Sequence, residues 1–429
     1  MRRSTVTILS LLVASAVSYA QNPISPEGVY IADPTARVDR DGTMYVYGSL
    51  DVSPRGYCSE RYHVLFSKDL KSWTLKKDSF VNDKTLFAPD MIRKDDTYYL
   101  YYDIPTGEEF VAVSDSPVGP FKDGVRIEGP MGIDPNIFVD NDGQAYYFWG
   151  QFAAKGAKMN PDMKTIDMST MVDSLVTEEK HHFHEGSFVF KRGKYYYFTY
   201  ADIGRQGRPT CIGYAMATSP FGPYEYKGVI VDSDACDRAV WNNHGSIVEY
   251  DGKWYVLYHR STGGTNTMRK ACIEPISFRE DGTICEVEMT SQGAAGPLDA
   301  YSGIAARRMC ILSGHACVKL EEGRTDHEIL TSIENGDMVA YKYLDFGKKT
   351  PERFTARVRG TGGARIGVTF DQRYLGSSCT LELPASKGDW MEISCEIPPE
   401  AKHQGVHAIW LSFAVPESGF LDVDWFRFD

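Results

Sequence analysis

The sequence predicts an all-β protein that consists of a five-bladed β-propeller followed by a β-sandwich domain of jelly-roll-like form. Aromatic residues make up 13% of the chain and gather in short alternating runs, which is typical of strands. No long stretch has the 3.6-residue periodicity of a helix. A segment with a polar turn between two strand-like runs recurs five times, which is the sequence pattern of propeller blades.

Each copy of this repeat opens with one variable residue, which we call the slot, followed by Pro or Gly and a small polar residue. An apolar run, a turn such as Asp-Gly and an aromatic strand follow, and together they predict a hairpin. Successive slots are 55, 46, 51 and 59 residues apart. They are occupied by Asp33, Ala88, Asp134, Glu185 and His244.

The chain divides into four expected parts. Residues 1–20 are typical of a signal peptide, because two Arg precede an apolar run and small residues precede a predicted cleavage after Ala20. A membrane anchor is the alternative, but the apolar run is too short to span a bilayer. We therefore expect a secreted or periplasmic protein. The propeller is expected over 21–290, a Gly/Ala/Pro-rich linker over 291–300 and the sandwich over 301–429.

The formal charge of −12 excludes some classes of partner. A chain this acidic is not expected to bind nucleic acid or an anionic membrane surface. After the N-terminal run, no segment is long and apolar enough for membrane insertion. The sequence makes no prediction of the oligomeric state.

The slots predict an active site. A propeller packs its innermost strands around one axis, so equivalent residues meet at one mouth of the channel. Carboxylates held this close raise one another's pKa, which suits a site that keeps a protonated acid beside an ionised base. Two carboxylates on either side of a bond can hydrolyse a glycoside. From the residues alone, Glu185 is the candidate acid, while Asp33 and Asp134 both remain candidates for the base.

Histidines and aromatic residues supply further candidates. His244 fills a slot, so we expect it to contact substrate or to support an axial ion or water, with a structural histidine as the alternative. His181, His182 and His184 suggest a metal site, but no partner set accompanies them, and we predict substrate or loop contacts instead. Four aromatic residues are candidates for a sugar platform, with packing inside the blades as the alternative. They are Trp73, Phe87, Trp149 and Trp241.

These motifs together resemble glycoside hydrolase family 43 over roughly residues 25–290. The resemblance rests on Asp33-Pro, Asp134-Pro and Glu185-Gly, and on 67-SKDLKSW-73, 87-FAPD-90 and 243-NHGS-246. It implies a five-bladed propeller that hydrolyses arabinose- and xylose-containing glycans with inversion. It also implies that Asp33 is the general base, Asp134 the pKa modulator and Glu185 the general acid.

The same resemblance implies roles for two further residues. Arg269 is similar to the family's late Arg, which contacts the sugar at the cleaved position, and His244 is similar to its channel His. No cofactor is required, although a structural calcium or other ion near His244 is possible. Phe87 stands where the family usually has Trp.

The C-terminal part resembles carbohydrate-binding module family 6. The resemblance rests on 335-NGDMVAYKYLDFG-347, Trp390, 405-GVHAIWLSF-413 and 422-DVDWFRF-428. The family often has a sugar-binding Asn where this chain has Asp422. Sugar binding and a structural role against the propeller both remain open for this domain.

The expected function is removal of terminal arabinofuranosyl or xylosyl units from plant-type polysaccharides or oligosaccharides. An α-L-arabinofuranosidase is the first choice, ahead of a β-xylosidase or a galactofuranosidase or galactan-acting enzyme. Exo action rests on the insert 51-DVSPRGYCSERYHV-64, which is expected to block the channel mouth. A non-catalytic sugar-binding propeller is disfavoured by the three acids. A retaining, fructan-cleaving propeller usually has Cys after its acid, whereas Glu185 precedes Gly-Ser.

Overall fold

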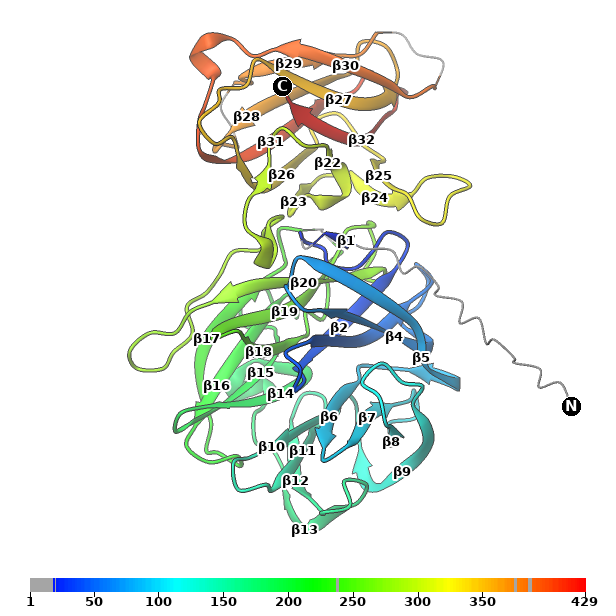
Figure 1. Cartoon of the computed structure of the whole chain (residues 1–429), viewed down its shortest axis with the longest axis vertical. Helices are drawn as coiled ribbons and strands as arrows, with labels where there is room; N and C mark the ends of the chain where they lie inside the picture. The colour runs from blue at the N-terminus through cyan, green and yellow to red at the C-terminus, as the bar shows by residue number, and fades with distance from the viewer. Residues whose placement is uncertain (1–17, 20, 237–238, 374–375, 385–387) are drawn as a thin grey trace, which may run out of the picture.

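The computed structural model consists of two β-domains, with the propeller below the sandwich in Figure 1. It describes residues 18–19, 21–236, 239–373, 376–384 and 388–429. The predicted signal peptide therefore lies outside the described residues, apart from Ser18–Tyr19, which form β1.

Five antiparallel sheets form the propeller, which confirms the predicted fold class and blade number. The first three blades contain four strands in sequence order, and β1 extends the outer edge of the first. Blade I comprises β2 (Tyr30–Val38), β3 (Met44–Asp51), β4 (Ser59–Ser67) and β5 (Ser72–Leu86). Blade II comprises β6 (Asp90–Lys94), β7 (Thr97–Asp103), β8 (Glu108–Ser114) and β9 (Lys122–Met131). Blade III comprises β10 (Asn136–Val139), β11 (Ala145–Trp149), β12 (Lys155–Met159) and β13 (Ile166–Val172).

The last two blades follow a single helical turn, α1 (Glu178–His181). Blade IV comprises β14 (Phe183–Arg192), β15 (Tyr195–Asp202), β16 (Cys211–Ala217) and β17 (Glu225–Asp232). Blade V comprises β18 (Ser246–Tyr250), β19 (Lys253–Ser261) and β20 (Arg269–Ile276).

The start of the domain closes the ring against blade V, which has only three strands. The Ile24 amide donates a hydrogen bond to Ala271 O on the free edge of β20, at 2.9 Å. The Asn22 side chain is fully buried and bonds both the carbonyl and the amide of Ile273, at 3.0 and 2.9 Å. Residues from both ends of the propeller sequence therefore complete one blade.

A single carboxylate links the inner strands of three blades. Asp90, the acid of the FAPD motif, is 2% exposed. It accepts hydrogen bonds from Thr35 Oγ1 (2.8 Å), Arg37 Nη2 (2.5 Å), Asn136 Nδ2 (2.7 Å) and the Ile137 amide (2.9 Å). A buried charge is tolerated only when it is paired and fully hydrogen-bonded. The hydrogen bonds of Asp90 therefore fix blades I to III in one position relative to each other.

The C-terminal domain is a sandwich of two six-stranded sheets. One sheet contains β21 (Leu298–Asp299), β26 (Met338–Asp345), β31 (Val406–Ala414), β28 (Arg365–Phe370) and β29 (Cys379–Glu382), with β23 (Ile311–Ser313) on β26. The other contains β24 (Cys317–Leu320), β25 (Glu328–Thr331), β32 (Leu421–Phe428), β27 (Arg353–Gly360) and β30 (Met391–Glu396), with β22 (Ile304–Ala305) on β32. Three 3-10 turns accompany them: η1 (Gly293–Ala295), η2 (Ala306–Arg308) and η3 (Pro399–Ala401).

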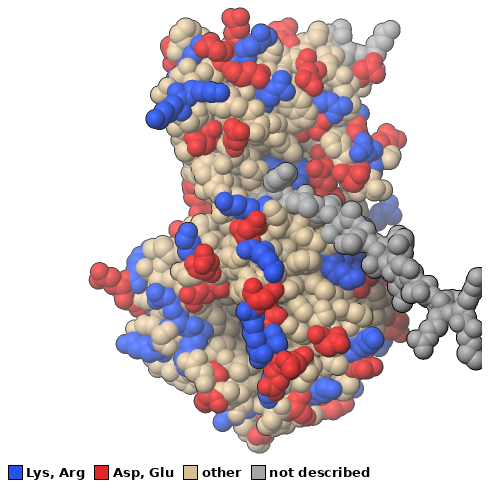
Figure 2. Space-filling view, in the orientation of Figure 1, with Lys and Arg blue, Asp and Glu red and all other residues tan. Residues whose placement is uncertain are grey.

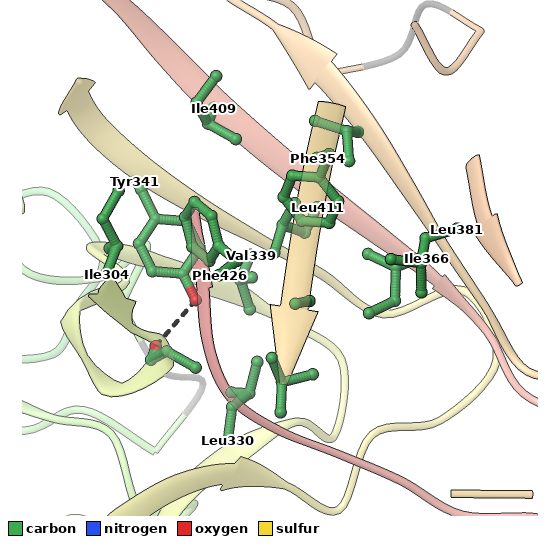
Figure 3. Close-up of a cluster of buried hydrophobic side chains, with 14 of the residues drawn as sticks. Ile304, Leu330, Val339, Tyr341, Phe354, Ile366, Leu381, Ile409, Leu411 and Phe426 are labelled. Atoms are coloured by element: carbon green, nitrogen blue, oxygen red, sulfur yellow. Dashed lines mark hydrogen bonds between the residues drawn. The ribbon is translucent and has the colours of Figure 1, made fainter. Parts of the chain in front are cut away.

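The core of the sandwich is apolar and comes from both sheets, as Figure 3 shows. Tyr341 on β26 meets Phe426 on β32 edge to face, with ring centroids 4.7 Å apart. The buried Tyr341 hydroxyl donates to Ala306 O at 2.8 Å, so the one polar group of the pair is satisfied.

Residues 291–300, the predicted linker, pack against both domains rather than forming a free connection, and Ala294 and Ala295 lie on the propeller core between blades I and V. The Ser291 and Gln292 amides both donate to Lys342 O, at 2.7 and 2.9 Å, and β21 pairs with β26. Across the same boundary, Lys270 Nζ of β20 lies 2.8 Å from Glu328 Oε1 of β25. Both side chains are almost completely buried, at 1% and 0% exposed.

The surface carries charges of both signs. On the face in Figure 2, Lys and Arg are interspersed with Asp and Glu over both domains. In the part of the chain that the structure describes, no helix has the length and apolar character needed to cross a membrane.

The buried ion pair between the domains gives a test of the fold. The variant Glu328→Ala leaves the Lys270 ammonium buried without its partner, and we expect the free energy of unfolding to fall by about 3–5 kcal/mol. Urea denaturation of the full chain measures this change. Glu417→Ala, which alters an exposed acid of the same domain, should change it by less than about 0.5 kcal/mol. Equal effects of the two variants would show that the ion pair does not hold the domains together.

Candidate active site

All five slot residues line one cavity of about 260 Å³, which is where the repeat predicts that they meet. Two residues predicted to contact substrate, Phe87 and Arg269, line it as well. A larger cavity of about 410 Å³ lies beside His182 and β17, but it contains no slot residue.

The backbone aims the acids into the cavity. Asp33 and Asp134 have positive φ angles of 51° and 57°, a conformation that Asp tolerates better than most residues. The β2–β3 register breaks between Ala32 and Thr35, and the β14–β15 register breaks on either side of Glu185. Such bulges turn a side chain away from its normal face of the sheet.

Arg269 holds Asp33 from the neighbouring blade. Its Nη1 lies 2.8 Å from Asp33 Oδ1, while its Nε and Nη2 bond the two oxygens of Asp51, at 2.9 and 3.0 Å. Ser49 Oγ donates to the other Asp33 oxygen at 2.7 Å. All three charged side chains are buried.

This environment keeps Asp33 ionised. Burial alone would raise the pKa of Asp33, but the positive charge of Arg269 outweighs it and holds that pKa well below its usual range. The carboxylate is therefore available as a base throughout the physiological pH range.

Asp134 has the opposite environment. Burial, followed by the charges of Glu185, Asp103 and Asp33, raises the pKa of Asp134 well above its usual value. Its amide donates to Oδ1 of Asp103 at 3.2 Å, and burial raises the pKa of Asp103 as well. One side of the cavity thus retains protons while Asp33, beside Arg269, does not.

Glu185 is 8% exposed and accepts a hydrogen bond on Oε2 from Gln151 Nε2 at 2.8 Å. Gln151 directly follows Gly150 after the end of β11, and it lines the cavity too. Since one oxygen has a neutral donor, the orientation of the carboxyl group is fixed without a permanent positive charge beside it.

The three histidines before Glu185 separate in space. His181 is buried and bonds the Thr177 amide and Tyr224 O, at 3.0 and 3.2 Å. His182 borders the larger cavity, and only His184 lines the active-site cavity. Within the described residues, no three His, Cys, Asp or Glu side chains come together in a way that could hold a metal ion.

His244 lies at the centre of the acids. Its Nδ1 is 3.9 Å from both Asp33 Oδ1 and Asp134 Oδ2. Burial lowers the pKa of His244 to about 4, which makes the imidazole neutral at pH 7. The ring packs against Gly186, where an added Cβ would lie 2.8 Å from the ring, so the Gly after Glu185 is required for this contact.

The prediction that Trp73 contacts substrate is wrong. Trp73 is on β5, the outer strand of its blade, and is fully buried in the core between blades I and V. Trp149 is also excluded as a sugar platform, because it is 1% exposed and packs between blades II and III. Trp241 does line the cavity.

Several residues that line the active-site cavity are not predicted from the sequence. Tyr57 and Cys58 come from the insert that was predicted to block the mouth, but neither was singled out. Tyr57 covers Arg269, with its ring centroid 4.8 Å from the guanidinium carbon. Gln151 and Asn242 lie in loops where no residue pattern distinguishes them.

In the sandwich, Asp422 is part of a buried ionic cluster. It accepts hydrogen bonds from Arg359 Nε at 2.9 Å and Thr331 Oγ1 at 2.5 Å. Arg359 and Arg357 both lie against the Trp390 ring, 4.6 and 4.9 Å from its centroid. The residue that replaces the family's Asn is thus engaged by protein groups, which favours the structural role for this position.

The neutral His244 makes stability depend on pH in a defined direction. An unfolded His takes up a proton near pH 6.5, whereas the folded one does so only at about pH 4. The contribution of His244 to the free energy of unfolding is therefore fully present above pH 6.5, the pKa of the unfolded state. It is lost as the pH falls toward about 4, the pKa in the folded state. Between pH 7 and pH 4, we expect the free energy of unfolding of the wild type to fall by roughly 3 kcal/mol more than that of His244→Gln. Parallel urea-denaturation results for the two proteins across this range would contradict it.

Comparison with known proteins agrees with this geometry. Residues 20–284 match the model of glycosyl hydrolases family 43, and residues 306–429 match carbohydrate binding module (family 6). A xylosidase/arabinosidase of Thermoclostridium stercorarium is 29% identical over 91% of this chain and 95% of its own. A β-xylosidase/α-arabinofuranosidase from a compost microbial metagenome, solved with xylotriose in calcium-free form, is 28% identical with a TM-score of 0.55, over 62% of this chain and 98% of that one. An arabinoxylan arabinofuranohydrolase from Bacillus subtilis, solved with cellotetraose, shares the fold over 96% of this chain and 99% of its own, at 24% identity and a TM-score of 0.55. The chain therefore belongs to glycosyl hydrolase family 43 and is a glycosidase.

Proposed function

We propose that this glycosidase removes terminal α-L-arabinofuranosyl units with inversion of configuration, and that β-xylosyl units are its second choice of substrate. The observation that carries the proposal is the electrostatic asymmetry of the cavity. Asp33 is kept ionised by Arg269, while Asp134 retains a proton beside Glu185. A hydrolase that works on acetals needs an ionised base and a separate acid, and Glu185, the proposed acid, lies beside the protonated Asp134.

In the proposed mechanism, Asp33 removes a proton from a water molecule that attacks the anomeric carbon. Glu185 gives its proton to the departing glycosidic oxygen, and Gln151 keeps the carboxyl group in place. Asp134, kept protonated by burial beside Asp103, adds no fixed negative charge next to Glu185 and is placed to orient it. Neutral His244 separates Asp33 from Asp134 without adding a charge.

The size of the cavity and the names of its relatives support a terminal pentose. A volume of about 260 Å³ is smaller than the usual range for drug-sized ligands, so it suits one sugar unit. Relatives named for xylosidase and arabinosidase activity cover most of the chain. The wall made by Tyr57 over Arg269 closes one side of the cavity, which supports exo action.

Export and a channel ion remain predictions. Export rests on the N-terminal pattern alone, and sequencing the N-terminus of the secreted protein tests for cleavage after Ala20. Calcium takes six to eight oxygen ligands, whereas His244 would offer a nitrogen, and the described residues supply no group of three acidic or imidazole side chains at one point. The described side chains therefore do not form a calcium site made of protein ligands. The proposed mechanism uses only the side chains named above.

Glycosyl fluorides separate the roles of the two acids, because fluoride departs without protonation. We expect Glu185→Gln to lose roughly 10³-fold or more in kcat/KM on an arabinofuranosyl oligosaccharide and far less on arabinofuranosyl fluoride. Asp33→Asn should lose activity on both, since water activation is needed in each reaction. NMR of the first-formed sugar reports inversion. Unchanged hydrolysis of the oligosaccharide by either variant, or retention of configuration, would contradict the mechanism.

Exo action predicts the products from a polymer. With arabinan or arabinoxylan, the wild type should release monosaccharide from the start, while the average chain length falls slowly. Anion-exchange chromatography and viscometry measure both quantities. Rapid loss of viscosity with little free pentose, together with inactivity on aryl glycosides, would show internal cleavage.

A further inference from the structure

Phe152 is exposed and strained at the rim of the active-site cavity. Its φ is 63°, a conformation that a bulky residue rarely adopts. Its amide donates to His184 O at 2.7 Å, and its carbonyl accepts from the Glu178 amide at 2.9 Å. These two bonds hold the backbone in place although the side chain is 52% exposed.

The Phe152 ring belongs to a row of three rings along this rim. It meets His184 edge to face, with centroids 5.3 Å apart. His184 in turn meets Trp241 edge to face, at 6.4 Å. Glu178 fixes His184 through a 3.0 Å contact between Oε1 and Nδ1. The row therefore runs from blade III across blade IV to the loop before blade V, and His184 and Trp241 line the cavity.

The row of three rings lies next to Glu185, the proposed general acid. His184 precedes Glu185 in the chain, and Phe152 follows Gln151, which bonds the Glu185 carboxyl group. The general acid must lie beside the glycosidic oxygen that it protonates, so the leaving group occupies the Glu185 side of the cavity. In an inverting hydrolysis the base and the acid act on opposite faces of the sugar, so the Asp33–Arg269 pair belongs to the side where the water attacks.

We propose that Phe152, His184 and Trp241 form the subsite for the leaving-group sugar, and that this sugar is a pyranose with a flat apolar face, such as a xylopyranosyl unit of a xylan chain. This inference rests on the proposed function of the same cavity. Aromatic surface lines ligand sites because it offers large apolar area, with few polar groups to set orientation. The imidazole of His184 supplies such a polar group between two apolar rings.

The strain at Phe152 distinguishes a binding role from a structural one. Glycine adopts φ near +60° without a steric penalty, so a residue selected only for stability at this position would be Gly or Asn. The ring also adds little to the core, since half of its surface is exposed. Phe152→Gly should therefore raise the thermal midpoint or leave it unchanged, while substrate binding weakens.

The test compares two substrates with the same arabinofuranosyl glycone. One is an arabinoxylo-oligosaccharide, whose leaving group is a xylose chain, and the other is arabinofuranosyl fluoride, whose leaving group is a single atom. For Phe152→Gly, the loss of kcat/KM on the oligosaccharide should exceed the loss on the fluoride by roughly tenfold, equivalent to ~1.4 kcal/mol, mainly through KM. Phe152→Tyr should restore most of this difference. Phe420→Gly, which removes a 45% exposed ring of the sandwich, should change neither value.

Equal losses on both substrates, or a lowered thermal midpoint with no change in their ratio, would overturn the proposal. A second measurement does not depend on turnover: titration calorimetry of xylotriose with Glu185→Gln, with and without Phe152→Gly. We expect the affinity to fall roughly tenfold, and an unchanged affinity would overturn the proposal. Inactivity of the wild type on the fluoride and on every oligosaccharide would instead contradict the proposed function, and calorimetry would then still decide whether the subsite exists.

Discussion

The buried guanidinium of Arg269 is the interaction on which the active site depends. It bonds Asp33 and Asp51 at the same time, so two carboxylates and one guanidinium group share one buried volume. Desolvating these charges costs several kcal/mol per ion, and the cost is offset only by close contact and complete hydrogen bonding. Because Arg269 begins β20 and Asp51 ends β3, the same contact fixes blade V against blade I.

The remaining acids are arranged around that fixed charge. The charged neighbours that act on Asp134 are the carboxyl groups of Glu185, Asp103 and Asp33, and Asp103 is itself buried behind it. The second oxygen of Asp103 has no hydrogen-bond partner among the described residues. Such a group stays neutral at a smaller cost than it stays charged. The propeller thus keeps ionised and protonated carboxyl groups a few side chains apart.

The periodic part of this design could be predicted from the sequence. Hairpin turns and slot spacing fixed the five blades, and they correctly brought Asp33, Asp134, Glu185 and His244 to one cavity. The same periodicity cannot tell an inner strand from an outer one by composition, since both carry aromatic residues. For that reason Trp73 is predicted at the site, although it lies on β5, an outer strand of its blade, and is fully buried. Tyr57 and Gln151 line the cavity from loops, where backbone conformation and not residue pattern decides which side chains face it.

The closure of the propeller ring makes the catalytic domain depend in part on the sandwich domain. The segment that completes blade V continues into Glu27 and Gly28, and both bond to Glu328 of the sandwich: the Glu328 amide donates to Glu27 Oε2 at 2.7 Å, and the Gly28 amide donates to Glu328 Oε1 at 3.2 Å. The segment that closes the propeller ring is therefore also held by hydrogen bonds to the sandwich domain. Exchanging that module for another by recombination would remove both contacts and leave the closing segment held by its bonds to β20, so a replacement module would have to supply an equivalent of Glu328.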